Sequence, residues 1–94
     1  VNTFADWFEN LDSIAAAKIA VAVSRMEAGN LSNIKWFSGI GEYKINWGPG
    51  YRIYLTKDGD ELIILFGGGI KKSQKKDIEK AKQLYQEYKN RKKK

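Results

Sequence analysis

The sequence contains no cysteine and no histidine among its 94 residues. Without cysteine there are no disulfide bonds and no thiolate metal sites, and without histidine there is no imidazole to act as a general base or a metal ligand. No apolar run approaches the roughly 20 residues that a membrane-spanning helix needs, and no signal peptide is visible at the start of the chain. We therefore expect a cytoplasmic protein.

The residues that are present suffice for one compact domain. Apolar residues make up 43% of the chain and include three Trp, four Phe and five Tyr, so we expect a single domain over residues 1–94. The net charge of +6 is unevenly distributed. Residues 71–94 hold eleven Lys or Arg against three Asp or Glu, whereas residues 1–70 hold six against eight. Such a basic block attracts polyanions, or it is a solvated helix face that ends in a disordered tail over residues 91–94.

Two helices are predicted at the start of the chain. Apolar residues at spacings of three and four over residues 4–11 predict a first helix, capped by Asn2 or Thr3. A second helix is predicted over residues 14–28, with Asp12 or Ser13 at its start and Gly29 at its end. We expect both helices to contribute to the core, through Trp7, Phe8 and Val21.

From residue 34 the apolar period changes to two, which indicates strands. The segments 43–47, 51–55 and 61–66 are separated by turns at 48–50 and 57–60, and the glycines at 67–69 are expected to break the last strand. Ser73 is placed to cap a final helix with an apolar face. The order predicts an α+β protein in which an antiparallel sheet has helices grouped beside it. The apolar face of the final helix is formed by Ile78, Ala81, Leu84 or Tyr85, and Tyr88.

A cationic surface is predicted on the central hairpin. A three-residue loop at 48–50 would pair Asn46 with Arg52 and Lys44 with Tyr54, and alternation would place these four side chains on one face of the sheet. Like charges on neighbouring strands are unfavourable unless something negative lies over them, and an RNA phosphate would serve. Tyr54 could stack a base. The alternative is an ordinary polar sheet face with cross-strand hydrogen bonds.

Three segments together resemble a known family. Residues 48–54 (GPGYRIY) are similar to the G-P-G-Y-R-[VI]-Y segment of HigB-like addiction-module killer proteins, which belong to the RelE/ParE superfamily. Residues 42–45 (EYKI) resemble the E-L-R-I of that family. Residues 63–78 (IILFGGGIKKSQKKDI) resemble its apolar strand followed by G-G-D-K-x-x-Q-x-x-D-I. The pair Phe4 and Trp7, the pair Gly29 and Asn30, and Lys35 also fit the family pattern, so the resemblance extends over nearly the whole chain.

The resemblance implies a fold, a function and a set of partners. The fold would be RelE-like, with two N-terminal helices packed on a four-stranded antiparallel sheet and a C-terminal helix. The protein would be the toxin of a type II toxin–antitoxin system, a ribosome-dependent mRNA endoribonuclease that needs no metal and no cofactor. Its partners would be an antitoxin, the ribosome and mRNA, with no membrane involved. The expected catalytic residues are Lys44, Arg52, Lys71 and Gln74, and the expected RNA-binding residues are Lys35, Asn46, Tyr54, Lys72 and Lys75.

The expected reaction is phosphoryl transfer within RNA, in which a 2′-hydroxyl attacks the adjacent phosphate. Arg52 and Lys71 would stabilise the charge that builds on the phosphate oxygens. The base would be Lys44, whose pKa clustered cations would depress, or Glu42. Alternatively, alignment of the RNA by the ribosome would replace a strong base.

One departure from the family pattern concerns residue 70. Ile70 stands where related proteins usually have a polar residue, so Lys71 would lack a hydrogen-bonding neighbour and activity would be weak. Three other functions stay open. The chain could be a ParE-like gyrase inhibitor, a catalytically impaired module that binds RNA or antitoxin, or a basic RNA-binding domain unrelated to toxins.

Overall fold

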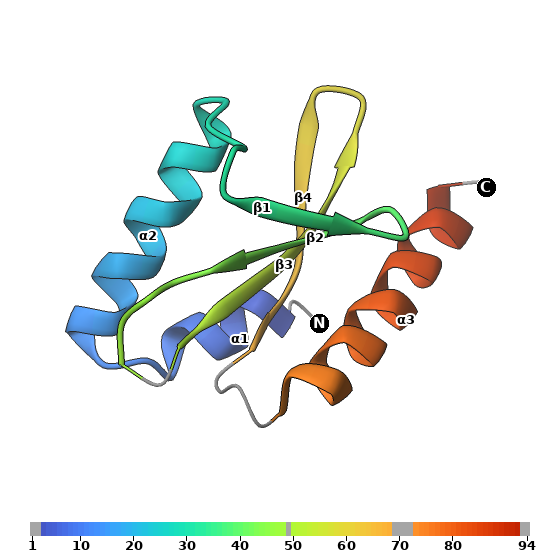
Figure 1. Cartoon of the computed structure of the whole chain (residues 1–94). Helices are drawn as coiled ribbons and strands as arrows, with labels where there is room; N and C mark the ends of the chain where they lie inside the picture. The colour runs from blue at the N-terminus through green and yellow to red at the C-terminus, as the bar shows by residue number, and fades with distance from the viewer. Residues whose placement is uncertain (1–2, 49, 69–72, 93–94) are drawn as a thin grey trace.

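The structure is a computed structural model of the chain, and it describes residues 3–48, 50–68 and 73–92. Three helices and four strands follow one another in the order α-α-β-β-β-β-α (Figure 1). The α+β class predicted from the sequence is confirmed. The elements are α1 (Thr3–Glu9), α2 (Ser13–Glu27), β1 (Ile34–Phe37), β2 (Ile40–Lys44), β3 (Arg52–Asp58), β4 (Glu61–Gly68) and α3 (Gln74–Lys92).

The two N-terminal helices begin and end close to the predicted positions. Asp12 is the N-cap of α2, and its Oδ1 accepts a hydrogen bond of 2.8 Å from the backbone N–H of Ala15. Beyond the helix, Gly29 has a φ of 98°, a conformation that glycine adopts without strain. Trp7 and Phe8 pack against the core as expected, but the prediction for Val21 is wrong because half of that residue is exposed.

The sheet is an antiparallel meander in the order β1-β2-β3-β4. Ser38 and Gly39 form a two-residue turn between β1 and β2, and both have positive φ angles, which suit the twist of a tight hairpin. A register shift between Tyr54 and Leu55 leaves Leu65 as the extra residue of β4, because Tyr54 pairs with Phe66 and Leu55 with Ile64.

The register of the central hairpin differs from the prediction by two residues. Lys44 pairs with Arg52, and Glu42 pairs with Tyr54, so the connection between β2 and β3 is longer than the three residues expected. Where this connection begins and ends, the backbone N–H of Ile45 donates a hydrogen bond of 2.8 Å to the carbonyl oxygen of Tyr51. A shift of two residues conserves the alternation of faces, so Lys44, Arg52 and Tyr54 still share one side of the sheet.

Helices cover both faces of the sheet. On one face, residues of α1 and α2 pack with Tyr43, Ile53 and Leu55 of the sheet. On the opposite face, α3 packs Ala81 against Ile40 and Tyr54, as Figure 1 shows by the placement of α3 across the sheet from α2. This arrangement corrects the expectation of an open cationic face in part, because Arg52 and Tyr54 are buried while Lys44 and Asn46 stay exposed.

Two glycines at the end of β4 allow this close packing. A Cβ atom on Gly67 would lie 2.1 Å from the ring of Trp7, and one on Gly68 would lie 2.6 Å from Oδ2 of Asp77. These residues were expected to break the strand, yet both pair with β3. Because neither residue has a side chain, α1 and α3 can both approach the end of β4 closely, one on each face.

The last helix reaches further than expected. Arg91 and Lys92 belong to α3, although residues 91–94 were predicted to form a disordered tail; residues 93–94 lie outside the described residues. The Lys92 ammonium contacts Asp58 at the tip of the β3–β4 hairpin, and the Tyr88 hydroxyl donates to the same carboxylate at 2.6 Å. Hydrogen bonds from Lys92 and then Tyr88 lower the pKa of Asp58.

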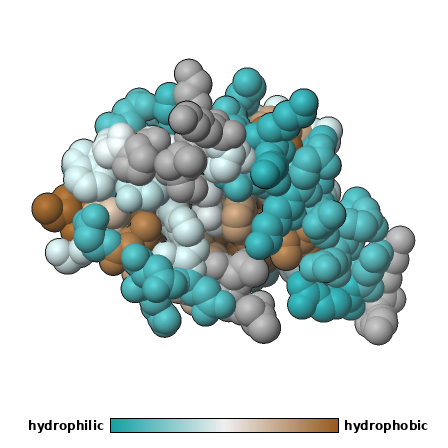
Figure 2. Space-filling model, turned by 90° about the horizontal axis from the view of Figure 1, so that it is seen from below, coloured by the Kyte–Doolittle hydropathy of each residue, from teal (hydrophilic) through white to brown (hydrophobic). Residues whose placement is uncertain are grey.

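Hydrophilic side chains dominate the side of the molecule formed by α3, and hydrophobic ones show in patches nearer α2 (Figure 2). In the described ranges, none of the helices combines the length and the apolar character needed to cross a bilayer.

Candidate functional site

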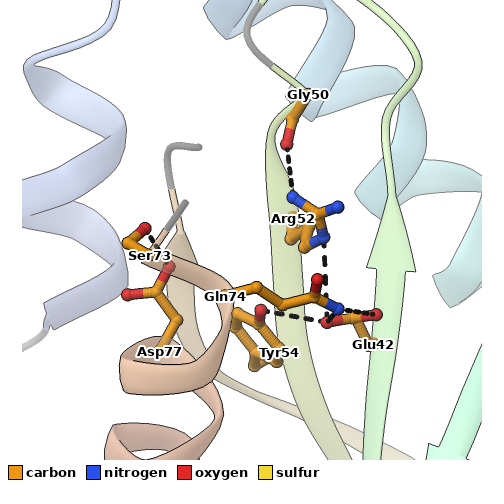
Figure 3. A network of polar contacts seen from close by, with 7 residues as sticks. All are labelled: Glu42, Gly50, Arg52, Tyr54, Ser73, Gln74 and Asp77. Carbon is orange, nitrogen blue, oxygen red and sulfur yellow. Dashed lines mark hydrogen bonds and ion pairs between the residues drawn. The ribbon is translucent and has the colours of Figure 1, made fainter. Parts of the chain in front are cut away.

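A buried polar network joins β2, β3 and the first turn of α3 (Figure 3). Glu42 on β2 is its centre. The Tyr54 hydroxyl donates to Glu42 Oε2 at 3.0 Å, and the Gln74 side-chain amide donates to both carboxylate oxygens at 3.3 and 3.0 Å. Glu42 and Gln74 are 32 residues apart in the sequence, so this contact fixes the start of α3 on the sheet.

Arg52 is the cation of the network. Its Nε lies 3.8 Å from Glu42 Oε2, and its Nη1 donates to the carbonyl oxygen of Gly50 at 3.1 Å. The side chains of Arg52 and Glu42 are only 5% and 8% exposed. Burying the two opposite charges together offsets much of the cost that either would carry alone. Among the described residues, the buried Nε of Arg52 has no hydrogen-bond partner.

This pairing changes the interpretation of the sheet charges. From the sequence, the like charges of Lys44 and Arg52 were expected to need an anion over them, and an RNA phosphate was the expected anion. Glu42 already supplies a negative charge beside Arg52, on the same face of the sheet. The repulsion between Lys44 and Arg52 is therefore reduced within the protein itself.

Tyr54 is fully buried, which removes the base-stacking role proposed from the sequence. Its ring stacks on Phe66, with centroids 6.1 Å apart and planes at 21°, and α3 covers it. Burial raises the pKa of the Tyr54 hydroxyl, and the hydrogen bond to Glu42 raises it further. The hydroxyl is therefore held protonated as a donor to the carboxylate.

The first turn of α3 carries a second polar pair. The Ser73 hydroxyl donates to Asp77 Oδ2 at 2.8 Å, and Asp77 lies against Gly68 at the end of β4. A carboxylate in the first turn of a helix is favourable to the helix dipole. Ser73 therefore supports the start of α3, as predicted, through Asp77 rather than alone.

The exposed part of the site consists of lysines and an asparagine around the network. Lys44 lies next to Arg52 across the strands, and Lys35 lies opposite Glu42 on β1. Asn46, beyond the end of β2, and Lys75, in the first turn of α3, are also exposed. These four residues keep the accessibility that RNA binding would need.

The fold brings together three of the four residues predicted to be catalytic. Lys44, Arg52 and Gln74 come from β2, β3 and α3 and meet around Glu42. The fourth, Lys71, lies outside the described residues, as do Lys72 and Ile70. Within the described ranges, no group of three or more acidic residues is placed to hold a metal ion.

Sequence reasoning missed the central position of Glu42. It was considered only as a possible base, whereas the structure makes it the hydrogen-bond acceptor for Tyr54 and Gln74 and the ion-pair partner of Arg52. The available signal was an isolated acidic residue directly before the predicted strand 43–47, among apolar and basic residues. It indicates a carboxylate that needs partners, but it does not identify them.

The fold and the site together define an α+β protein with a meander sheet between helices and a buried Glu–Arg–Tyr–Gln network. The chain is 44% identical over 87 residues to an uncharacterized protein of Haemophilus influenzae (strain Rd), and the match covers 90% of the chain and 88% of that protein. The chain therefore belongs to the same family as this uncharacterized protein. No protein-family model matches the chain, and no solved structure matches it significantly.

Proposed function

We propose that the protein is the toxin of a type II toxin–antitoxin system and that it cleaves mRNA on the ribosome, with a RelE-like fold of the HigB kind. The observation that carries the proposal is the convergence of Lys44, Arg52 and Gln74 at one place from three separate elements. The motifs in residues 48–54 and 63–78 supply the resemblance to RNA-cutting toxins.

The chemistry requires cations at the surface, because the phosphodiester gains negative charge in the transition state. Lys44 is exposed and is the best placed of the described catalytic residues to contact a phosphate. Arg52 lies directly beside it on β3, with its charge already paired with that of Glu42. Lys35, Asn46 and Lys75 extend the exposed polar surface along which RNA would lie.

In the proposed reaction, the 2′-hydroxyl attacks the adjacent phosphorus and the 5′-oxygen leaves, which yields a 2′,3′-cyclic phosphate and a 5′-hydroxyl end. The 2′-hydroxyl proton passes to water and solvent protonates the leaving oxygen, while Lys44 serves as a cation beside the phosphate. The ribosome aligns the reacting groups, which reduces the need for a strong base. Lys71 remains the proposed second phosphate ligand.

Glu42 has a positioning role in this scheme. Its two carboxylate oxygens accept hydrogen bonds from Tyr54 and Gln74 and lie next to Arg52, so they are already occupied. Glu42 therefore orients the guanidinium of Arg52 and the start of α3, and we do not assign it the role of base.

The partners follow from the class of toxin proposed. They are the ribosome, mRNA and an antitoxin that neutralises the protein in the cytoplasm. The balance of +8 over residues 71–94 supports binding to an acidic partner or to RNA.

A translation extract tests the proposal. A defined mRNA is translated with the purified protein, and cleavage is mapped by primer extension. We expect cuts in phase with codons, with cyclic phosphate at the 3′ ends. Lys44→Gln should lower the cleavage rate by roughly 10²-fold, whereas Lys57→Gln, which removes an exposed lysine of β3, should not change it. Equal activity of the two variants would contradict the assignment.

A second function is favoured by the burial of Arg52, whose side chain is only 5% exposed. In that case the Glu42–Arg52 pair is structural, and the protein is a catalytically impaired module that binds RNA or antitoxin. RNA binding that depends on Lys44, without any cleavage in the extract, would select this alternative.

A further inference from the structure

A groove runs between α2 and the end of β2, beside the segment that leads to β3. Its volume is about 640 Å³, and its walls come from the outer side of α2 and from the segment 43–47. Figure 1 shows α2 alongside this segment. The groove is open to solvent, and residues of both faces of the segment 43–47 line it.

One wall of the groove is apolar although it faces solvent. The residues of α2 that face the core are Ala15, Ile19, Ala22 and Met26. Beside them, Ala17 and Val21 line the groove, and Ile14 extends the same stripe of the helix without lining the groove. Ile14 is 60% exposed and Val21 is 50% exposed. The apolar surface of α2 therefore continues beyond the part that the sheet covers.

The rim of the groove is basic. Lys18 and Arg25 on α2 and Lys44 on β2 line it, and none of its eleven described lining residues is acidic. Lys18 is held in place, because its ammonium lies 5.5 Å from the centre of the Trp47 ring. The three cations thus surround an apolar floor without a neighbouring carboxylate in the lining.

We propose that this groove binds a protein segment that carries both acidic and apolar side chains. Apolar side chains of the segment would pack on Ala17 and Val21, and its carboxylates would pair with Lys18, Arg25 and Lys44. An amphipathic segment is the usual occupant of a groove along one helix, with anchors at helical spacing. The complementary charges commit the proposal to an acidic partner.

RNA fits the same groove less well. The phosphates of RNA would find the cations, but its sugars and phosphates gain little from the aliphatic floor. Bases need a free aromatic face for stacking, and the ring of Trp47 already has Lys18 and Tyr51 against it. The apolar stripe on α2 therefore favours a peptide.

The inference rests on the lining of the groove and not on the proposed nuclease function. One consequence alone depends on that function: because Lys44 lines both the groove and the candidate site, a bound segment would block RNA from Lys44. Peptide binding and RNA cleavage are measured separately, so the two proposals fail separately.

The test is a selection from a displayed library of random peptides of about 14 residues on the folded chain. We expect selected peptides to combine Asp or Glu with Leu, Ile or Phe and to compete with one another. Arg25→Glu and Val21→Ser should each weaken their affinity by about tenfold or more. Lys82→Glu, which makes the same charge change on the exposed side of α3, should weaken it less than about threefold.

Three results would overturn the proposal. The first is the absence of peptides that bind more tightly than about 100 µM. The second is an equal loss of affinity for Arg25→Glu and Lys82→Glu, which would indicate attraction by net charge alone. The third is an RNA oligonucleotide whose binding requires Arg25 and Val21 when that of the peptides does not. Far-UV circular dichroism of each variant establishes that the fold is intact, and Arg25→Glu and Val21→Ser provide independent probes.

Discussion

Replacing Tyr54 by phenylalanine tests whether the buried network holds the fold together. The substitution retains the ring, which packs beneath α3 and stacks on Phe66. It removes only the hydroxyl that donates to Glu42 Oε2 at 3.0 Å. The carboxylate keeps Gln74 as a donor and Arg52 as a neighbour, so it loses one of its partners and not all of them.

The size of the effect follows from the burial of both groups. Tyr54 is fully buried and Glu42 is 7% exposed, so water cannot replace the lost donor without rearrangement. Hydrogen bonds to charged groups contribute roughly 1.5–3 kcal/mol, and we expect a loss of about 2 kcal/mol in the free energy of unfolding. In a domain of this size that loss lowers Tm by roughly 8–16 °C.

Urea denaturation followed by circular dichroism measures the change directly. Tyr88→Phe is the matched control, because the Tyr88 hydroxyl also donates to a carboxylate, that of Asp58, at a partly exposed site. Its effect should be clearly smaller, since water can replace that donor. A loss below about 0.5 kcal/mol for Tyr54→Phe, or equal losses for the two variants, would refute the account of a buried network.

Further predictions concern pH, packing and the contact of α3 with the β3–β4 hairpin. The pKa of Tyr54 is raised in the folded state, so the contribution of its hydroxyl to stability is complete below the ordinary pKa of about 10. Above pH about 10, the stability advantage of wild type over Tyr54→Phe should shrink by about 1.4 kcal/mol per pH unit. Urea denaturation up to pH about 11 measures this change. Gly67→Ala should cost about 1–3 kcal/mol, since the new Cβ would lie 2.1 Å from the ring of Trp7, and a variant as stable as wild type in the same assay would contradict that close approach. Because the pKa of Asp58 is lowered in the folded state, its contact with Lys92 stabilises the fold above pH about 4, and this stabilisation is lost as the pH falls further. Asp58→Asn should therefore reduce the dependence of the free energy of unfolding on pH below about 4.

The faces of the central strands could be predicted from the sequence, whereas their register could not. Apolar alternation from Tyr43 continues to Trp47, so a short loop and a longer one fit the pattern equally well. The predicted and observed registers of β2 and β3 differ from each other by two residues, and both place Lys44, Arg52 and Tyr54 on the same face. The loop length is decided by local contacts, such as the hydrogen bond from the Ile45 N–H to the Tyr51 carbonyl, which periodicity does not report.

The position of α3 on the sheet could not be predicted from the sequence. Its apolar face was recognised from Ile78, Ala81 and Tyr88, yet the sequence does not say which side of the sheet receives it. Since α1 and α2 occupy one face, α3 takes the other and buries Tyr54. The part of the central hairpin that carries Arg52 and Tyr54 was predicted to be open to solvent, but it belongs to the core and contains the polar network. The predicted roles of Lys71 and Ile70 concern residues outside those that the structure describes.

The central claim is that the protein cleaves mRNA through Lys44, and induction of the chain in cells followed by transcriptome-wide mapping of RNA 5′ ends tests it most directly. The account predicts growth arrest with new 5′ ends in codon phase for wild type and for Lys57→Gln, and their loss for Lys44→Gln at equal protein levels. Growth arrest with a DNA-damage response and no new 5′ ends would contradict it and identify a gyrase inhibitor instead.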